Sequence, residues 1–266
     1  MNKICVFAKN KNTYFINRLI EEVGQSVSLF DPWTDLDLPT ADKYLARTTG
    51  VYKSDLDLLI LGSMSENQVV NPVSVLKRFR SKSSQWAWFD DHDLPALPWL
   101  GLKGIDPITA EKFSVLYPEM VVKPNFGQGG WGIEVLTRDT LLGWLKKKKK
   151  MQDEDYLIQP LIKDAAEYRY FFIKDERPLV LRRKARSGIA ANFKREGEAE
   201  LVTFPDEFNS EVKRLISLSG AQYGAIDLFI QHDRLFILEL NAVPGIEQLE
   251  NISRQNIIRK LLQHLF

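Results

Sequence analysis

The chain has 266 residues, of which 44% are hydrophobic, and its formal net charge is +1. This length predicts two to three packed subdomains, and the near-neutral charge gives no general attraction to nucleic acid or anionic lipid. No apolar run approaches the length of a membrane span. The N-terminal residues have the pattern of a buried strand and not that of a secretory signal. The single cysteine, Cys5, excludes an internal disulfide. We therefore expect a soluble cytoplasmic protein with no membrane or nucleic-acid partner.

The first third of the chain alternates strands and helices. Strands are predicted at 3–8, 27–30 and 56–61, and helices at 14–23 and, as one or two segments, at 73–89. The strand at 56–61 is expected because an unbroken apolar run suits a strand that is covered on both faces. This order predicts an open α/β sheet of the βαβ type.

From about residue 109 the pattern changes to α+β, with largely antiparallel strands. Helices are predicted at 109–116, 141–150, 207–218 and the C-terminus, and strands at 119–123, 132–136, 156–159, 168–173, 179–183, 224–230 and 235–240. We expect three subdomains: an N-terminal one at 1–80, a central one at 81–160 and a C-terminal one at 161–266.

The last predicted hairpin carries the strongest chemical signal. Alternation places Glu239 and Asn241 on one face of their strand, together with Ile237. A three-residue loop at 232–234 sets Asp227 directly opposite Glu239, and directly paired Cβ atoms lie about 4.5–5.5 Å apart. Such close carboxylates repel unless a cation joins them, and oxygen ligands favour Mg²⁺. The alternative is a pair of exposed charges that never meet.

A glycine-rich turn and a basic strand add two further signals. The turn at 127–132 contains four glycines, among them Gly129 and Gly130, and Lys123 ends the strand that enters it. Such a loop turns backbone N–H groups toward an anion, and its alternative is a flexible hairpin turn. Arg182 lies on the later strand, where interior cations suit phosphate or carboxylate. A solvated edge strand is expected to account for Arg183.

Taken in order, these segments resemble the ATP-grasp fold, and most closely its RimK-like branch of glutamate ligases, over about residues 82–249. The fold class implied is α/β plus α+β, with an N-terminal open-sheet subdomain before the ATP-clasping ones. Asp227, Glu239 and Asn241 match the metal ligands of the family, and residues 242–247 are similar to its N-x-x-P-G-x-E ending. Lys123 matches a lysine that contacts the ATP phosphates. The turn at 127–132 matches the lid loop above them, and Lys82 resembles the earlier phosphate lysine.

The resemblance also assigns residues around the nucleotide. Gln159, Pro160 and Leu161 stand at the hinge whose backbone reads the adenine edge, and Glu167 stands near the ribose. The remaining matches are the catalytic cations Arg169 and Arg182, and Asn192 beside the γ-phosphate. Three departures are Pro160 in place of a glutamate, a loop from there to Glu167 that is about two residues shorter than in the family, and Ala190 in place of an arginine.

The resemblance implies a ligase that uses ATP and Mg²⁺, with Mn²⁺ as the alternative ion, and acts through an acyl-phosphate. It adds an amino acid, glutamate by resemblance, to a peptide, protein or small carboxylate. A phosphotransferase on the same fold and a weakened nucleotide-binding regulator remain alternatives, and a homo-oligomer is left open. The lysine run at 146–150 is expected to be a solvated helix end rather than a nucleic-acid contact.

Overall fold

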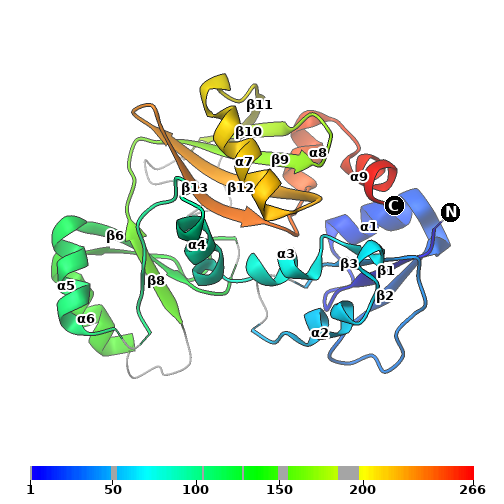
Figure 1. The fold of residues 1–266 in the computed structure, drawn as a ribbon, viewed down its shortest axis with the longest axis horizontal. Coiled ribbons are helices and arrows are strands. Elements are labelled where there is room, and N and C mark those ends of the chain that lie inside the picture. The colour runs from blue at the N-terminus through cyan, green and yellow to red at the C-terminus, as the bar shows by residue number, and fades with distance from the viewer. Residues whose placement is uncertain (1, 49–52, 104, 128, 149–154, 185–197) are drawn as a thin grey trace.

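The computed structural model describes every residue except 1, 49–52, 104, 128, 149–154 and 185–197. Its strands form three sheets, two of four strands and one of five. Figure 1 shows the N-terminal sheet at the right, the central sheet at the left and the five-stranded sheet between them at the top. Each of the three predicted subdomain ranges contains one of these sheets.

The N-terminal sheet is parallel, as the βαβ pattern predicts. Its order is β2-β1-β3-β4, and its strands are β1 (Ile4–Phe7), β2 (Val27–Phe30), β3 (Lys43–Ala46) and β4 (Val69–Val70). Its helices are α1 (Tyr14–Val23) and α2 (Leu56–Gly62). Thr13 begins α1 by accepting a hydrogen bond from the N–H of Ile16. Cys5 is a buried core residue of β1.

The prediction of a strand at 56–61 is wrong, because these residues form α2 and the third strand is β3. Leu58 and Leu61 are buried, three residues apart, whereas Leu59 is 72% exposed. That spacing belongs to a helix, and a short apolar run does not distinguish a buried strand from a helix. Asp57 is buried in the same helix, where it accepts hydrogen bonds from Thr48 and Arg80.

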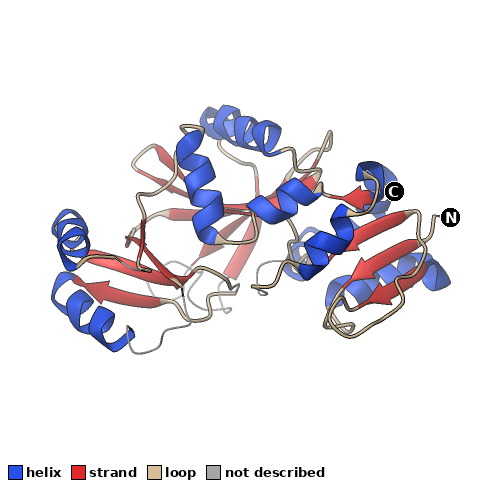
Figure 2. Cartoon of the chain, turned by 60° about the horizontal axis from the view of Figure 1, so that its bottom comes forward, coloured by secondary structure: helices blue, strands red, loops and turns tan. Residues whose placement is uncertain are grey.

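The central sheet is antiparallel and is covered by two helices on one face. Its order is β5-β8-β6-β7, and its strands are β5 (Leu100–Gly101), β6 (Glu119–Pro124), β7 (Glu134–Thr137) and β8 (Tyr156–Pro160). The covering helices are α5 (Pro107–Leu116) and α6 (Arg138–Lys148), which lie side by side in Figures 1 and 2. Met120 and Val122 pack toward these helices. Alternation therefore turns Lys123 to the opposite face of β6.

The C-terminal sheet is also antiparallel, and β13 is one of its two edges. Its order is β11-β10-β9-β12-β13, and its strands are β9 (Ala166–Ile173), β10 (Leu179–Lys184), β11 (Glu198–Val202), β12 (Tyr223–Gln231) and β13 (Arg234–Asn241). Its helices are α7 (Asn209–Ser219), α8 (Glu247–Ser253) and α9 (Ile257–Leu265). The predicted single C-terminal helix is thus two helices, separated at Arg254, which has a φ of 58°.

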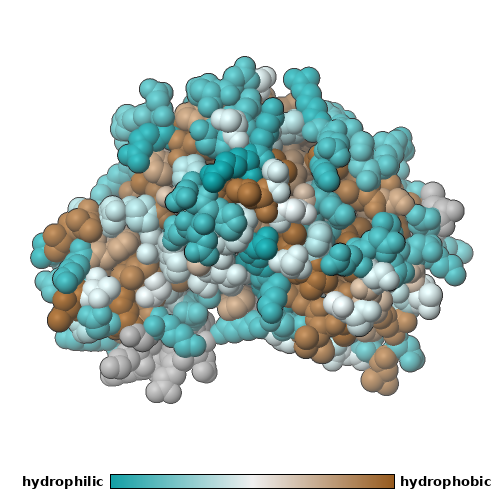
Figure 3. Space-filling model, in the orientation of Figure 1, coloured by the Kyte–Doolittle hydropathy of each residue, from teal (hydrophilic) through white to brown (hydrophobic). Residues whose placement is uncertain are grey.

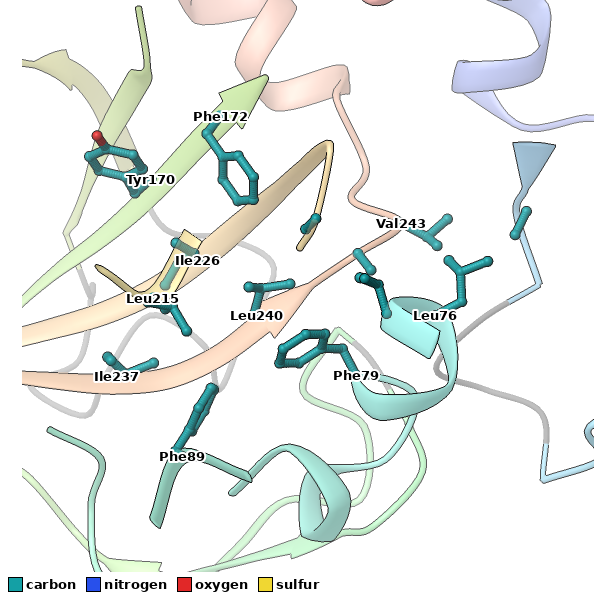
Figure 4. Close-up of a cluster of buried hydrophobic side chains, with 14 of the residues drawn as sticks. Leu76, Phe79, Phe89, Tyr170, Phe172, Leu215, Ile226, Ile237, Leu240 and Val243 are labelled. Carbon is teal, nitrogen blue, oxygen red and sulfur yellow. The ribbon is translucent and has the colours of Figure 1, made fainter. Parts of the chain in front are cut away.

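Two helices between the sheets complete the fold, so the predicted segment at 73–89 divides into α3 (Val73–Arg78) and α4 (Lys82–Asp91). Figure 4 shows Phe79 and Phe89 packed against Ile237 and Leu240 of β13. On the other face of the sheet, Ile4 of β1 shares a core with residues of β9 and α9. The C-terminal sheet is therefore buried on both faces and joins the N-terminal and central parts of the chain.

The face of the molecule in Figure 3 mixes hydrophilic and hydrophobic side chains, with apolar ones at its left edge over α5 and α6 and at its lower right. Ile108 and Leu116 of α5 are 65% and 71% exposed. Within the described ranges, no helix is long and apolar enough to cross a membrane.

Asn71 links the end of β4 to the open ends of β12 and β13. Its Nδ2 donates to the carbonyls of Ala242 (2.7 Å) and Tyr223 (3.0 Å), and its Oδ1 accepts from the N–H of Gln222 (2.8 Å). Asn71 is fully buried and has a φ of 59°. Asparagine tolerates this left-handed conformation, and its amide satisfies backbone groups that no strand partner reaches.

We expect Asn71→Ala to destabilise the fold by about 3 kcal/mol, because several buried backbone groups lose their partner at once. Urea unfolding measures this change. Asn17→Ala is the matched control, since Asn17 makes one exposed side-chain hydrogen bond, to Asn12. A loss of stability as small for Asn71→Ala as for Asn17→Ala would contradict this account.

Candidate functional site

Asp227 of β12 lies directly opposite Glu239 of β13, as predicted. The turn that produces this pairing differs from the prediction. Gln231 pairs with Arg234, so the loop is the two residues His232 and Asp233, both with positive φ. A two-residue loop of this kind is typical of tight hairpins. It would place Asp227 opposite Leu238, but a β-bulge adds one residue to β13 and restores the pairing with Glu239.

The bulge also changes which residues share a face of β13. Ile237 pairs with Leu228 and packs in the core with Leu240 (Figure 4), away from Glu239. The expectation that Ile237 and Glu239 share a face is therefore wrong. The extra residue, Leu238, separates a core segment of β13 from a segment that presents Glu239 beside Asp227.

Two arginines lie against Asp227. Arg169 of β9, its partner in the sheet register, places Nη1 3.4 Å from Asp227 Oδ2. Arg183 of β10 places Nη1 3.7 Å from Asp227 Oδ1 and 3.2 Å from Glu167 Oε1. Burial opposes the charge of Arg183, but the carboxylates of Asp227 and Glu167 outweigh it and hold the pKa of this guanidinium above its usual range. Carboxylates and guanidinium groups thus meet on one face of the sheet.

The structure does not bring Arg182 to this face. Arg182 pairs with Tyr168 and Glu200, points away from Asp227 and is exposed. The expectation that Arg183 is a solvated edge residue is wrong, because its side chain is only 15% exposed and ion-paired. Alternation along β10 places the two arginines on opposite faces of the sheet. It does not say which of these faces also presents Asp227, so the sequence carries no signal for Arg183.

The two predicted lysines come together with the glycine-rich turn. Lys123 Nζ donates to Gln159 Oε1 at 3.0 Å, and Lys82 Nζ donates to the carbonyl of Gly127 at 2.9 Å. Burial, reinforced by the charge of Lys82, lowers the pKa of Lys123 to about 8, although nearby carboxylates act in the other direction. The two ammonium groups are therefore close enough to repel, which an anion placed between them would relieve.

The turn after β6 depends on glycine. Gly129 and Gly130 have φ values of 68° and 76°, and Gly132 has a φ of 71°. A Cβ on Gly132 would lie 2.8 Å from Cγ of Pro124, so a side chain there is excluded by contact as well as by conformation. The predicted anion-binding role of this turn remains an expectation.

At the predicted hinge, the side chain of Gln159 is the group available to a ligand. Gln159 is 1% exposed, and its Nε2 has no hydrogen-bond partner within the described part of the chain. Because Lys123 donates to Oε1, the free group is a donor, which suits an acceptor atom of a nucleotide. The N–H of Leu161 is already donated to the carbonyl of Glu119, and Pro160 has no N–H. The backbone N–H of Leu161, which we expected to bind the adenine edge, is thus already paired within the protein.

The residues at Asp227 fit a divalent cation. Asp227 Oδ1 is buried and makes no hydrogen bond among the described residues. Glu239 lies across from it, and Asn241 follows two residues later, with its Oδ1 accepting from the N–H of Val243. In the described ranges no group of three or more His, Cys, Asp and Glu side chains is arranged for a metal. The predicted ligand set, with two carboxylates and one amide, stays a prediction. Oxygen ligands of this kind suit Mg²⁺ when water or phosphate completes its shell.

A cavity of about 200 Å³ lies beside the two arginines. This volume is below the ~300–1,000 Å³ of pockets for drug-sized ligands, and it suits a ligand of amino-acid size. Its lining, with two cations, one carboxylate and an apolar floor, consists of Arg169, Phe171, Leu181, Arg183, Gly245, Glu247, Gln248 and Leu249. Sequence reasoning did not find this cavity. Asn192 and Ala190 lie outside the described residues.

Residues 106–265, more than half of the chain, match the RimK-like ATP-grasp domain family. The tetrahydromethanopterin:alpha-L-glutamate ligase of Methanocaldococcus jannaschii is 26% identical over 206 residues, which cover 74% of this chain and 69% of the relative. A probable alpha-L-glutamate ligase of Xanthomonas euvesicatoria pv. vesicatoria is 24% identical over 285 residues, covering 99% and 97%.

Solved structures share the fold at lower sequence identity. D-cycloserine synthetase DcsG superposes with a TM-score of 0.76 at 13% identity, covering 99% of each chain. The ATP-grasp ligase PsnB, in complex with precursor peptide PsnA2 and AMPPNP, superposes with a TM-score of 0.68 at 18% identity, covering 98% of this chain and 96% of PsnB. The three-sheet architecture is thus that of ATP-grasp ligases.

We expect metal-free ADP binding to take up a proton near pH 8.5 and to weaken as the pH rises above 8. With a pKa of about 8, Lys123 is largely neutral at pH 8.5 in the free protein, and adjacent phosphates would restore its charge. Calorimetry in two buffers of different ionisation enthalpy measures the proton uptake. It should be absent at pH 6.5 and in Lys123→Met. Proton-neutral binding by the unsubstituted protein at pH 8.5 would place the phosphates elsewhere.

We expect Arg183→Met to lower ADP formation by about 100-fold or more, the usual loss when one preorganised charge on a transition state is removed. Arg182→Met, the same change one residue away on the exposed face, should leave the rate within about twofold. Steady-state assays with thermal unfolding of both variants test the pair. The reverse order of effects would return the catalytic assignment to Arg182.

Proposed function

We propose that this chain, which belongs to the RimK-like ATP-grasp family and is therefore an ATP-dependent ligase that forms C–N bonds, adds glutamate to the carboxylate of a peptide, a protein or a small molecule. One observation carries the proposal. The face of the C-terminal sheet that presents Asp227 and Glu239 also holds Arg169 and Arg183 beside a cavity of amino-acid size.

The cations around the site supply what a triphosphate needs. Lys82 and Lys123 approach from α4 and β6, and the glycine-rich turn adds backbone N–H groups. Gln159 Nε2 offers a fixed donor to the nucleotide. Asp227, Glu239 and Asn241 would hold Mg²⁺, or Mn²⁺ in its place, and this ion supplies positive charge to the phosphate oxygens during transfer. The groups proposed for the phosphates and the metal thus come from α4, β6, the glycine-rich turn and the β12–β13 hairpin.

The reaction follows from these positions. The γ-phosphoryl group of ATP passes to an acceptor carboxylate, which forms an acyl-phosphate and ADP. The amine of glutamate then attacks the acyl carbon, phosphate leaves, and the amine loses a proton. Arg183 is placed to stabilise the charge on the transferred phosphate and on the tetrahedral intermediate. We assign no general base.

The cavity supports an amino acid as the amine substrate. Arg169 and Arg183 line the cavity, and with Arg183 assigned to the transferred phosphate, Arg169 is the guanidinium group that suits a carboxylate of glutamate. Glu247 lines it as well and suits the amino group. The names of the relatives from Methanocaldococcus and Xanthomonas specify glutamate, which agrees with this match of charges.

The test is ADP release from Mg²⁺-ATP with glutamate and a panel of acceptors, followed by mass spectrometry of the products. The panel contains short acidic peptides and small carboxylates, because one similar structure holds a precursor peptide and one relative acts on a pterin. We expect an acceptor heavier by one glutamyl residue, with one ADP and one phosphate released for each product. A phosphorylated acceptor would instead make the protein a phosphotransferase. Nucleotide binding without turnover across the panel would favour a regulator.

Asp227→Asn should abolish this turnover, because it removes one of the two carboxylates on the proposed metal. Asp233→Asn is the matched control, since it makes the same change in the turn of the same hairpin, where Asn also accepts a positive φ. Turnover that persists in Asp227→Asn at the level of Asp233→Asn would refute the metal assignment.

A further inference from the structure

Two side chains of α4 hold the bulged edge of β13. An edge strand leaves N–H and C=O groups that need partners from outside the sheet. Trp86 Nε1 donates to the carbonyl of Leu238 at 2.7 Å, and Gln85 Oε1 accepts from the N–H of Leu240 at 2.9 Å. These two bonds lie on either side of Glu239. The position of this carboxylate is therefore coupled to α4.

Trp86 also contacts the other side of the site. The Nζ of Lys123, from β6 of the central sheet, lies 5.5 Å from the centre of the Trp86 ring. A cation over an indole face is attracted at this distance. Trp86 is 1% exposed, and Trp99 packs against it with ring centres 5.9 Å apart. The Trp86 side chain thus contacts Lys123 with its ring face and the bulged strand β13 with its indole N–H.

The first turn of α4 is anchored to the central sheet as well. The N–H groups of Lys82 and Ser83 donate to the backbone and side-chain oxygens of Asn125, and Ser81 caps the helix. Asn125 follows β6 and precedes the glycine-rich turn. Lys82, Lys123 and Glu239 are consequently placed relative to one another through a single helix that bridges two sheets.

We propose that Trp86 is a positioning residue of the site, which sets the separation between Lys123 and the bulged strand that carries Glu239. The inference rests on the proposed function, because it assigns Lys123 to phosphate and Glu239 to the metal. A residue that served only the core would affect stability alone. The indole combines a ring face for Lys123 with a donor for Leu238, so Trp86→Phe separates the two contacts.

The experiment measures Mn²⁺ binding to the protein–ADP complex by electron paramagnetic resonance, together with metal-free ADP binding by calorimetry. Trp86→Phe keeps the ring and loses the donor. We expect Mn²⁺ affinity to fall by about tenfold or more, as when other outer-shell partners of metal ligands are removed. Metal-free ADP affinity should stay within about twofold, because the ring remains under Lys123. Gln85→Met, which removes the second bond to β13, should weaken Mn²⁺ binding in the same way.

Trp99→Phe is the matched control. It removes an indole hydrogen bond of 2.7 Å, to Asp90, from the ring next to Trp86 and outside the site. If Trp86→Phe and Trp99→Phe lower the unfolding temperature and Mn²⁺ affinity alike, Trp86 is a core residue and the inference is overturned. If the unsubstituted protein binds Mn²⁺ no better than Asp227→Asn, the proposed metal site itself fails. That outcome differs from a failure of the positioning role alone, in which the unsubstituted protein still binds the ion.

Discussion

The pairing of Asp227 with Glu239 across two adjacent strands is the constraint on which the site depends. Two carboxylates at cross-strand distance repel, and the burial of Asp227 adds to this cost. The fold offsets the cost with Arg169 and Arg183 from the neighbouring strands. Removal of Asp227 would relieve the repulsion but would also take a carboxylate partner from both arginines. The close approach of the two acids is the feature that favours a cation between them.

The surrounding structure maintains this pairing at three places. A two-residue turn starts the hairpin, and the bulge at Leu238 then moves the register by one residue so that the acids meet. Trp86 and Gln85 satisfy the peptide groups on either side of Glu239. Asn71 binds the far ends of both strands. The N-terminal part and α4 thus contribute to β12 and β13 through hydrogen bonds, in addition to packing.

Much of this arrangement was predictable from local patterns, and the remainder depends on contacts distant in sequence. Alternation along two strands indicated the facing acids, and the glycines after Lys123 indicated a tight turn, whose anion-binding role stays a prediction. Asp227 met Glu239 although the predicted loop was one residue too long, because the bulge compensated for the error. The helix at Leu56–Gly62 was predicted as a strand, since a short apolar run has no clear period. Arg183 was assigned to solvent because strand order and register decide which side chains of β10 share a face of the sheet with Asp227, and local patterns do not encode them.

The arrangement of charge in the site bears on whether the nucleotide and the metal bind separately or as one complex. Lys82 and Lys123 lie together beside the glycine-rich turn, and the carboxylates of Asp227 and Glu239 lie together on the hairpin. A divalent cation alone would meet the positive charge of the two lysines, and a triphosphate alone would meet the two acids of the hairpin. A nucleotide that already carries its metal places positive charge at Asp227 and negative charge at Lys123. The charge distribution on these two sheets therefore suits the metal–nucleotide complex better than either component alone.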